Sequence, residues 1–495
     1  MSTHLNRRAL LLAGAGTFTT AALLTFQPAV AGTTSSQVFT GKFTDPDGPD
    51  WVYLPFDVPA GVNRIDVSYT YTPVHTPVGL SFNVVDIGIF DPSGKGLGNI
   101  AGFRGWSGGA RSSFTLAATD ATPGYLPGPI TPGRWRIALG PYQIQKPGTP
   151  YEVRVTLTYG EPGATAVANP APRAVEGTGA GWYRGDLHVH TVHSDGSQTQ
   201  ADVLQYAAAA GLDFIGTSEH NTSSAQWTWG DYLVGDYADF LVIAGEEVTT
   251  RAGHWLATGL RNTNPKRTWV DWRYRPEDHQ LKRFTKLVRD QGGLSIAAHP
   301  YQLGGGITWE FGYDFGQMDA IEVWNGPWSG LNAVANGRAV TQWHNLLVKG
   351  VFKPAVGNSD THKQSQQIGL AQTVVRAESL SADAIIAGYR GGHSWITGSS
   401  AVGLTFTASL GDVTGECGDR VRSRATDQVG VHLEVTGVDG AVATLIGPKG
   451  VLATAPAVDG TITLDTTVKG GTAFIRVEVK AGSTMVALTN PIFLA

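Results

Sequence analysis

Hydrophobic and polar residues alternate in short runs along the first third of the chain. Four clear runs lie at residues 51–58, 64–71, 135–139 and 151–159. Turn-forming sequences such as Pro59-Ala60-Gly61 separate them. A period of two is the spacing of a strand with one buried face, and proline and glycine commonly bound such strands. The pattern predicts an antiparallel β-sandwich at residues 32–160.

The pattern changes after a stretch rich in proline, glycine and alanine at residues 161–181, which has the composition of a linker. Helix-like segments then occur at residues 200–210, 276–291, 331–347 and 381–390. Short apolar strands alternate with them, at residues 214–217, 240–244, 294–298 and 320–323. Alternating strands and helices predict a parallel sheet or barrel at residues 182–397, with its chemistry at the carboxyl ends of the strands. Strand patterns without helices return at residues 398–495 and predict a second small β-sandwich.

Composition is that of a folded protein with several domains. The 495 residues suffice for two to four domains at roughly 150 residues each. Hydrophobic residues make up 42% of the chain and charged residues 16%, which excludes a disordered protein. The net charge of -5 argues against a nucleic-acid partner. The single cysteine excludes a disulfide framework and a thiolate zinc cluster.

Residues 1–31 have the layout of an export signal. Asn6-Arg7-Arg8 precedes an uncharged apolar stretch at residues 9–26, and Ala29-Val30-Ala31 forms an A-x-A cleavage sequence. The apolar stretch is only weakly hydrophobic, which argues against a stable membrane span. The paired arginines favour a twin-arginine signal over an ordinary secretory signal. Either signal predicts a secreted or extracytoplasmic protein.

Histidine and carboxylate residues follow several predicted strands of the middle region. Nine of the thirteen histidines lie between His188 and His362. The motifs in chain order are His188-Val189-His190, Ser194-Asp195-Gly196, Glu219-His220-Asn221, Gly245-Glu246-Glu247, His299-Pro300 and Asp360-Thr361-His362. In a strand, both rings of an HxH pair lie on the same side and can hold one cation. Because strand ends converge in a barrel, we predict that these groups form one metal site.

The same motifs resemble those of a known superfamily. The segments HVHTVHSDG, TSEHN, AGEEVTTRAGHW, AAHP, EVWN and GNSDTH are similar to motifs of the polymerase and histidinol phosphatase (PHP) superfamily of metal-dependent phosphoesterases. Within it, they are most similar to the CehA/McbA-type metallohydrolases. The resemblance spans about residues 188–362 and leaves the outer domains uncovered. It implies a multidomain α/β plus all-β protein, with a distorted (β/α)7 PHP barrel flanked by N- and C-terminal β-sandwiches.

The resemblance also implies a metal ligand set for two or three divalent cations. One cation would be held by His188, His190, Glu247 and Asp360, a second by Glu247, His254 and His299, and a third by Asp195, His220 and His362. Mixed imidazole and carboxylate ligands suit Zn²⁺, Mn²⁺ or Fe²⁺, and the sequence does not choose among them. His220, Asp360 and His362 are also candidate proton relays where a metal site is only partly filled.

Several cations in one site favour hydrolysis of phosphate esters, because they generate hydroxide from water near neutral pH and neutralise charge on substrate oxygens. Candidates for binding the substrate are Arg184, Arg251, Asn325 and Lys363. The three cationic residues flank the ligand motifs, and Asn325 follows a strand end where it could line the mouth of the site. A solvated surface charge is an equally good interpretation of each cationic residue.

Three functions remain open at this point. The first is an exported metal-dependent phosphoesterase acting on a small organic phosphate. The second is a carbamate, ester or amide hydrolase with the same metal centre, because activated water attacks a carbonyl carbon as readily as phosphorus. The third is a non-catalytic binding protein; it predicts missing ligands, whereas all nine matched positions carry competent ones. The two sandwiches could contact cell wall or carbohydrate, or bind nothing.

Overall fold

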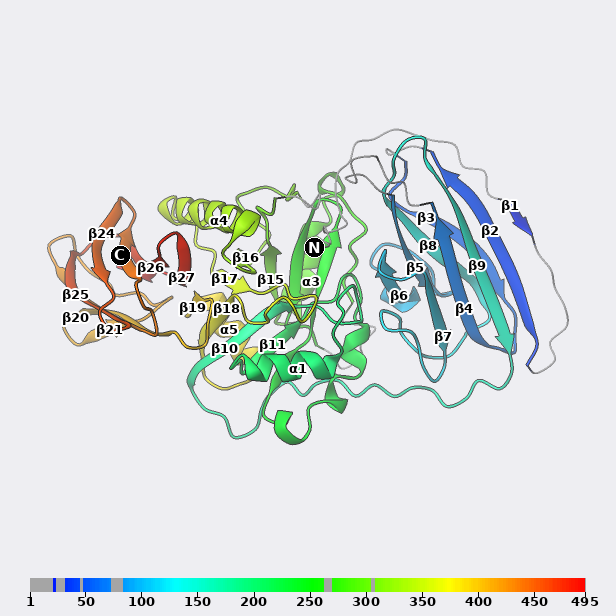
Figure 1. The fold of residues 1–495 in the computed structure, drawn as a ribbon, viewed down its shortest axis with the longest axis horizontal. Coiled ribbons are helices and arrows are strands. Elements are labelled where there is room, and N and C mark those ends of the chain that lie inside the picture. Colours follow the sequence, from blue (N-terminus) through cyan, green and yellow to red (C-terminus); the bar gives the residue numbers. More distant parts are fainter. Residues whose placement is uncertain are drawn as a thin grey trace.

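The structure, a computed structural model, describes residues 21–23, 32–44, 48–72, 83–261, 269–303 and 308–494. Figure 1 shows a β-sandwich at one end of the molecule, an α/β region in the middle and a second β-rich region at the other end. Both arginines of the predicted export signal lie outside the described residues, and only the short strand β1 (Ala21–Leu23) falls within that segment. No helix in the described ranges is long and apolar enough to cross a membrane.

Two antiparallel sheets form the N-terminal sandwich, with the orders β1-β2-β9-β4-β7 and β3-β8-β5-β6. The first sheet contains β2 (Thr34–Phe43), β4 (Val62–Tyr71), β7 (Ser113–Ala117) and β9 (Thr149–Tyr159). The second contains β3 (Val52–Val58), β5 (Val84–Phe90), β6 (Phe103–Gly108) and β8 (Gly133–Gln143). Ile65, Trp135 and Val153 are buried between the sheets. The antiparallel strands predicted from the period of two are therefore confirmed here.

Two further sheets form the α/β region. In the first, β10 (Gly181–Val189), β11 (Phe214–Thr217) and β12 (Leu241–Ile243) are parallel, and β18 (Gln372–Ala377) and β19 (Ser394–Thr397) continue it in antiparallel pairing. The second has the order β13-β14-β15-β16-β17, with strands at Gly245–Thr250, Gly253–Thr258, Leu294–Ala298, Ala320–Asn325 and Ala355–Asn358.

The helices within the described residues of this region lie where the sequence predicts them. They are α1 (Gln200–Ala209), α3 (Leu281–Asp290), α4 (Gly330–Val348) and α5 (Ala382–Gly391). Short 3-10 turns occur at Ile100–Gly102, Ser224–Trp227, Trp229–Asp231, Gly235–Tyr237 and Pro276–Asp278. Thr199 caps α1: its hydroxyl accepts the backbone N–H of Asp202, and the Asp202 carboxyl accepts the backbone N–H of Thr199. This reciprocal cap fixes where α1 begins.

The two sheets meet at two isolated parallel bridges. His220, just after β11, pairs with Glu247 on β13, and Val189 at the end of β10 pairs with Thr361, just after β17. Each bridge joins the carboxyl end of an interior strand of the first sheet, β10 or β11, to an edge strand of the second sheet, β13 or β17, or to the residues just after it. Strand ends from both sheets consequently converge, which brings together residues far apart in the sequence.

The described residues do not show a regular (β/α)7 barrel. Strands β13, β14 and β15 pair antiparallel, and the described helices are few for a barrel of that kind. Only Arg251 and Ala252 connect β13 to β14. Such a short link can only reverse the chain, because a parallel crossover needs about a dozen residues or more. Every residue of β13 and β14 is buried, so no alternation in the sequence indicates this hairpin.

The C-terminal region continues the sheet of the α/β region. Strand β19 pairs with β27, and the order runs on as β27-β26-β23-β24, with β28 paired to β26. These strands lie at Val442–Gly447 (β23), Gly450–Pro456 (β24), Phe474–Ala481 (β26), Thr484–Thr489 (β27) and Ile492–Phe493 (β28). An opposing sheet contains β20 (Gly403–Leu410), β21 (Val413–Gly415), β22 (Gln428–Thr436) and β25 (Thr461–Lys469). Val431, Leu445 and Val477 lie in the core between them.

Aromatic side chains join the N-terminal sandwich to the α/β region. Phe103 on β6 stacks on Trp269, with ring centroids 4.1 Å apart and planes at 7°. Nearby, Trp106 and Trp272 have ring centroids 4.6 Å apart. All four rings belong to one hydrophobic cluster that spans both regions. The sandwich therefore shares a core with the α/β region.

Candidate metal centre

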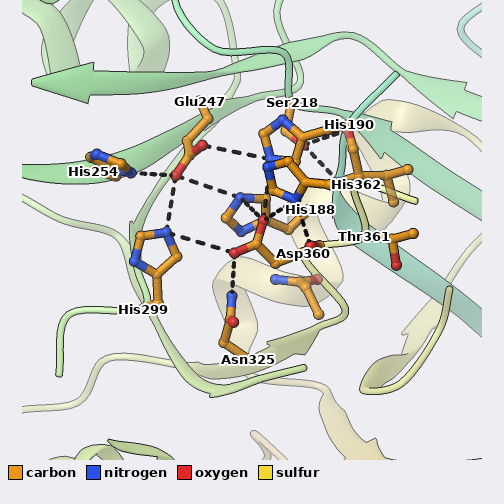
Figure 2. A network of polar contacts seen from close by, with 12 residues as sticks. His188, His190, Ser218, Glu247, His254, His299, Asn325, Asp360, Thr361 and His362 are labelled. Atoms are coloured by element: carbon orange, nitrogen blue, oxygen red, sulfur yellow. Dashed lines mark hydrogen bonds and ion pairs between the residues drawn. The ribbon is translucent and has the colours of Figure 1, made fainter. Parts of the chain in front are cut away.

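The predicted metal ligands lie where the two sheets of the α/β region meet. Each is on a strand or just beyond a strand end: His188 and His190 at the end of β10, Asp195 in the following loop, His220 after β11, Glu247 on β13, His254 on β14, His299 after β15, and Asp360 and His362 after β17. Figure 2 shows imidazole rings from several strands directed at the carboxyl groups of Glu247 and Asp360. All nine side chains, eight from the strand-end motifs and His254 from the family resemblance, thus meet in one cluster.

Glu247 lies at the centre of the cluster, and its side chain is only 1% exposed. Its two oxygens lie 2.7 Å from His220 Nδ1, 2.9 Å from His254 Nδ1, 3.0 Å from His299 Nε2, 3.5 Å from His188 Nε2 and 3.6 Å from His190 Nε2. A carboxylate surrounded by imidazole nitrogens in this way is able to bridge more than one cation.

Asp360 faces Glu247 across the cluster. Its Oδ1 lies 3.3 Å from Nε2 of His188, 3.3 Å from Nε2 of His190 and 3.5 Å from Nδ1 of His362. The backbone of Asp360 has φ +52°, and that of His299 has φ +31°. Non-glycine residues seldom adopt this left-handed region, and such outliers concentrate at functional sites. Here the unusual backbone turns both side chains into the cluster.

Asp195, His220 and His362 form the more open side of the cluster. Asp195 Oδ1 lies 3.4 Å from Nε2 of His220 and 3.3 Å from Nε2 of His362. The Asp195 side chain is 37% exposed and that of His362 is 20% exposed, whereas His188 and His190 are fully buried. A substrate would therefore reach the cluster from the side of Asp195 and His362.

Among the residues that the structure describes, four groups of side chains have ligand atoms within 4.8 Å of one another, the arrangement needed to hold a cation. They are His190/Asp195/His220/His362, His188/His190/Glu247, His188/His299/Asp360 and His220/Glu247/His254. The first contains the implied third metal set, extended by His190. The implied second set does not appear as one group, because His299 is grouped with His188 and Asp360 instead of with Glu247 and His254.

The polar atoms of the cluster fit a bound cation. His188 Nε2, His190 Nε2 and Asp360 Oδ1 are buried and have no hydrogen-bond partner. Buried polar atoms nearly always have such a partner. The 3.3 Å separation of these nitrogens from Asp360 Oδ1 matches ligands placed about 2.0–2.2 Å from a common ion. A divalent metal ion bound between these three atoms would explain why they lie buried without hydrogen-bond donors.

Charges and burial within the cluster keep Glu247, Asp360 and His190 in the protonation state that binds metal. Burial alone would raise the pKa of Glu247, but the histidines around it, foremost His220, hold that pKa well below its ordinary value. The pKa of Asp360 is likewise lowered, with His188 and His190 outweighing burial. Burial, together with the neighbouring His362 and His220, lowers the pKa of His190 to about 3. Anionic carboxylates and a neutral imidazole are the states required for coordination.

A buried glutamate that sequence reasoning missed holds two of the candidate ligands. Glu322 on β16 is 1% exposed. Its Oε1 accepts Nδ1–H of His188 at 3.1 Å and an amide N–H of Asn358 at 2.8 Å. Its Oε2 accepts the backbone N–H of His299 at 2.7 Å and an amide N–H of Asn325 at 3.0 Å. Donation from Nδ1 leaves the Nε2 lone pair of His188 directed at Glu247 and Asp360.

A second buried glutamate holds His190 through a serine. The Ser194 hydroxyl donates to Glu219 Oε2 at 2.5 Å and lies 3.3 Å from His190 Nδ1. Glu219 also accepts the backbone N–H and the hydroxyl of Thr191. This chain fixes the ring of His190 with Nε2 toward the cluster. The signal for both glutamates was present in the sequence, because each is a carboxylate within or directly after an apolar strand.

The four predicted substrate-binding residues do not all face the cluster. The guanidinium of Arg184 contacts the Val402 carbonyl at 2.7 Å and lies over the ring of Trp395, away from the ligands. The guanidinium of Arg251 donates to the Asp50 carbonyl at 3.0 Å, in the N-terminal sandwich. Both guanidinium groups thus have contacts outside the cluster, and a role of these arginines in substrate binding stays a prediction.

The other two predicted substrate residues lie near the ligands. Asn325 donates to Asp360 Oδ2 at 3.3 Å in addition to Glu322, so its amide orients ligands directly. Lys363 is exposed and follows His362 at the open side of the cluster. Among the described residues, no arginine or lysine forms an ion pair with Asp195, Glu247 or Asp360. The positive charge needed to balance these carboxylates therefore comes from histidine or from metal.

Comparisons with known proteins give distant similarities. No family model matches the chain. Over 158 residues it is 28% identical to an uncharacterized protein of Methanocaldococcus jannaschii, covering 29% of this chain and 81% of that protein. A two-domain protein from Bacteroides vulgatus containing a predicted PHP-like metal-dependent phosphoesterase shares 19% identity, with 67% of this chain and 100% of that chain covered and a TM-score of 0.34. An amidohydrolase from Chromobacterium violaceum shares 16% identity, with 37% and 89% covered and a TM-score of 0.26.

Proposed function

We propose that this chain is a metal-dependent hydrolase whose centre holds two or three divalent cations. One observation carries the proposal: two carboxylates, the buried Glu247 and the partly buried Asp360, are surrounded by imidazole nitrogens from several strands. The distant similarities reported above are consistent with a hydrolase but do not carry this conclusion. The motif resemblance to the PHP superfamily, and to its CehA/McbA-type members, supports the same class.

The four groups of convergent ligand atoms are the places where cations would be held. Divalent cations at such a site lower the pKa of water toward neutrality and neutralise charge on substrate oxygens. Glu322 and Glu219 keep the rings of His188 and His190 in the required orientation. Mixed nitrogen and oxygen ligands suit Zn²⁺, Mn²⁺ or Fe²⁺.

The chain's own residues also define how a substrate would enter and where protons would move. The exposed side chain of Asp195 marks the entrance, while burial of His188, His190 and Glu247 excludes bulk water from the inner half. Burial lowers the pKa of His362, but Asp195 and Asp360 outweigh this effect and raise the pKa to about 10. His362 is therefore able to hold a proton beside Asp360 when no cation displaces it, which supports a relay role for this pair.

The favoured reaction is hydrolysis of a small organic phosphate ester. Several cations close together suit a phosphoryl group, whose oxygens carry the charge that the metals neutralise. We further propose export through the twin-arginine-type signal at residues 1–31, so that the chain acts outside the cytoplasm. Contact of the sandwiches with carbohydrate or cell wall remains a prediction from the sequence alone.

A carbamate, ester or amide hydrolase is the second candidate, and one observation favours it. Arg184 and Arg251, the arginines expected to bind phosphate, both have their guanidinium groups committed to contacts outside the cluster. Of the three predicted cationic residues, Lys363 is exposed and directly follows His362. A substrate with less negative charge than a phosphate monoester has less need of a fixed cationic side chain.

Two measurements on the purified chain test the proposal. Elemental analysis should find two to three divalent cations per chain, and chelation should abolish hydrolysis that added metal restores. Rates with p-nitrophenyl phosphate, bis-p-nitrophenyl phosphate and an aryl carbamate then separate the two reactions. Turnover of the carbamate alone would select the second candidate, and full activity of the metal-free chain would refute both.

A pair of neighbouring variants provides the matched control. Glu247→Gln should lose metal and activity, because it removes the charge that several imidazoles share. Glu246 is also fully buried, and burial raises its pKa well above the ordinary value, so its neutral form is favoured. Glu246→Gln is close in shape and charge to that neutral form and should keep both metal and activity. Equal loss in both variants would contradict the assignment of Glu247.

A further inference from the structure

A glycine of the N-terminal sandwich contacts two loops that carry candidate ligands. Gly124 lies between β7 and β8. Its N–H donates to the Ser224 hydroxyl at 3.0 Å, and its carbonyl accepts the Thr222 hydroxyl at 2.8 Å. The same Ser224 hydroxyl lies 2.9 Å from Nδ1 of His193. Gly124 thereby links the loop that follows His220 to the loop that precedes Asp195.

Only glycine suits this position. The backbone of Gly124 has φ +101°, which side chains rarely allow. An added Cβ would lie 3.0 Å from the Trp106 carbonyl oxygen and 3.1 Å from that of His193. The sandwich and the ligand-bearing loop are thus in backbone contact, with no room for an intervening side chain.

An arginine of the sandwich supports the same ligand loop from a second direction. The guanidinium of Arg111, in the turn between β6 and β7, donates to the carbonyl of Val192. Val192 lies between His190 and Asp195, the two candidate ligands at either end of this short segment. Arg111 therefore fixes the course of the backbone from the buried ligand to the exposed one.

The aromatic interface reaches the other ligand loop. The indole N–H of Trp269, which stacks on Phe103 of the sandwich, donates to the Asn221 carbonyl at 3.1 Å. Asn221 directly follows His220 and has φ +56°. Its side chain accepts the backbone N–H of Thr249 at 2.7 Å. The sandwich thus helps to hold the strained turn that directs His220 toward Asp195.

From these contacts we infer that the N-terminal sandwich is a structural part of the metal centre. Through Arg111 and Gly124 it positions the loops that carry Asp195 and His220, and so completes the outer ligand group His190/Asp195/His220/His362. The inner ligands have their own support in Glu322 and in strands of the α/β region. The inference rests on the proposed function, because it requires that this group binds metal. Arg111, Thr222 and Gly124 are positioning residues and touch no ligand atom themselves.

Metal titration of the full chain tests the inference. Thr222→Val removes the hydroxyl that donates to Gly124 while keeping its shape, and Arg111→Met removes the contact with Val192. Mn²⁺ is titrated calorimetrically into chelator-treated protein. Each variant should bind the outermost cation about tenfold or more weakly, the effect typical of lost partners beyond the ligands themselves. Binding of the inner cations should be unchanged.

Matched controls separate this effect from general destabilisation. Arg134→Met removes an exposed pair with Asp57 on the same sandwich, and Thr156→Val removes a surface contact with Ser36. Both should bind Mn²⁺ as the unaltered chain does. Asp195→Ala identifies the titration step that belongs to the outer ligand group. Adding Thr222→Val to the Asp195→Ala variant should cause no further loss of Mn²⁺ affinity. Thermal unfolding of the metal-free proteins reports whether each variant is folded.

The outcomes separate the inference from the proposed function. The inference would be overturned if a folded Thr222→Val chain bound every Mn²⁺ ion with unchanged affinity. This outcome does not depend on whether the Arg111→Met variant folds. Equal weakening of inner and outer steps would also overturn it, because the role would then be general. An unaltered chain that binds neither Mn²⁺ nor Zn²⁺ would instead contradict the metal centre as a whole.

Discussion

Replacing Glu322 by glutamine should disable the cluster without removing any candidate ligand. The carboxyl group of Glu322 accepts four hydrogen bonds, two at each oxygen, from His188, Asn358, His299 and Asn325. Glutamine has one oxygen and one NH₂ group. Whichever way the amide is turned, two of these donors must face another donor.

The size of the effect follows from this count. A hydrogen bond to a charged acceptor contributes about 1.5–3 kcal/mol, so losing two costs about 3–6 kcal/mol of unfolding free energy. Since Glu322 is only 1% exposed, water cannot replace the lost partners. Loss of the support for a metal-binding imidazole typically weakens metal affinity about 10–100-fold. The ring of His188 and the strained turn at His299 should both lose their fixed orientation.

Chemical denaturation of the metal-free chain and Mn²⁺ titration measure the two effects separately. Glu246→Gln is the reference, because Glu246 is equally buried but accepts one backbone N–H, from Val270. It should unfold and bind metal much as the unaltered chain does. If Glu322→Gln retained both stability and metal affinity, Glu322 would not position His188 and His299.

Three further predictions concern metal, ligand grouping and pH. Chelation should lower the melting temperature, since a ligand present at 100 times its Kd stabilises the fold by about 2.7 kcal/mol per site; an unchanged melting curve would exclude a structural contribution. Asp195→Ala should remove one cation and leave the inner ones, because Asp195 contacts His220 and His362 at the open side; loss of every cation would refute separate groups. Burial opposes the low pKa of Asp50, but Arg275 and Arg251 hold it below the ordinary value. The stabilising effect of the Asp50 carboxylate is therefore complete above the unfolded pKa and is lost as the pH falls through the lower folded value. Asp50→Asn should flatten the acid limb of the curve of unfolding free energy against pH. An unchanged acid limb would refute a stabilising role for the contacts of Asp50 with Arg275 and Arg251.

Much of the fold was predictable because its signals are local. Period-two runs indicated the strands of the sandwich, and the four helices within the described residues of the α/β region lie at the predicted segments. The β13–β14 hairpin was not predictable in the same way. Both strands are buried on both faces, so the sequence lacks the alternation that would separate a hairpin from parallel strands. That hairpin interrupts the regular strand–helix alternation that the sequence pattern had indicated.

The candidate site was likewise predictable from the sequence in part. The sequence indicated eight of the nine cluster residues through a local signal, a histidine or carboxylate at or after the end of an apolar strand, and the family resemblance added His254. Glu322 was missed although it interrupts an apolar strand, and only its four donors reveal its role. The sequence did not show that Arg184 lies four residues along a strand from His188, about 13 Å. It also did not show the contact of Arg251 with Asp50, which lies 201 residues earlier in the chain.

The sequence by itself determined which segments form strands and helices and which side chains bring imidazole or carboxylate to the strand ends. Those properties depend on neighbouring residues. The tertiary structure decided how the ligands are grouped, which glutamates hold them and why a sandwich far away in sequence touches their loops. These features depend on contacts between residues a hundred or more positions apart, such as Gly124 with Ser224 or His188 with Glu322. Only the packed chain brings such residues into contact.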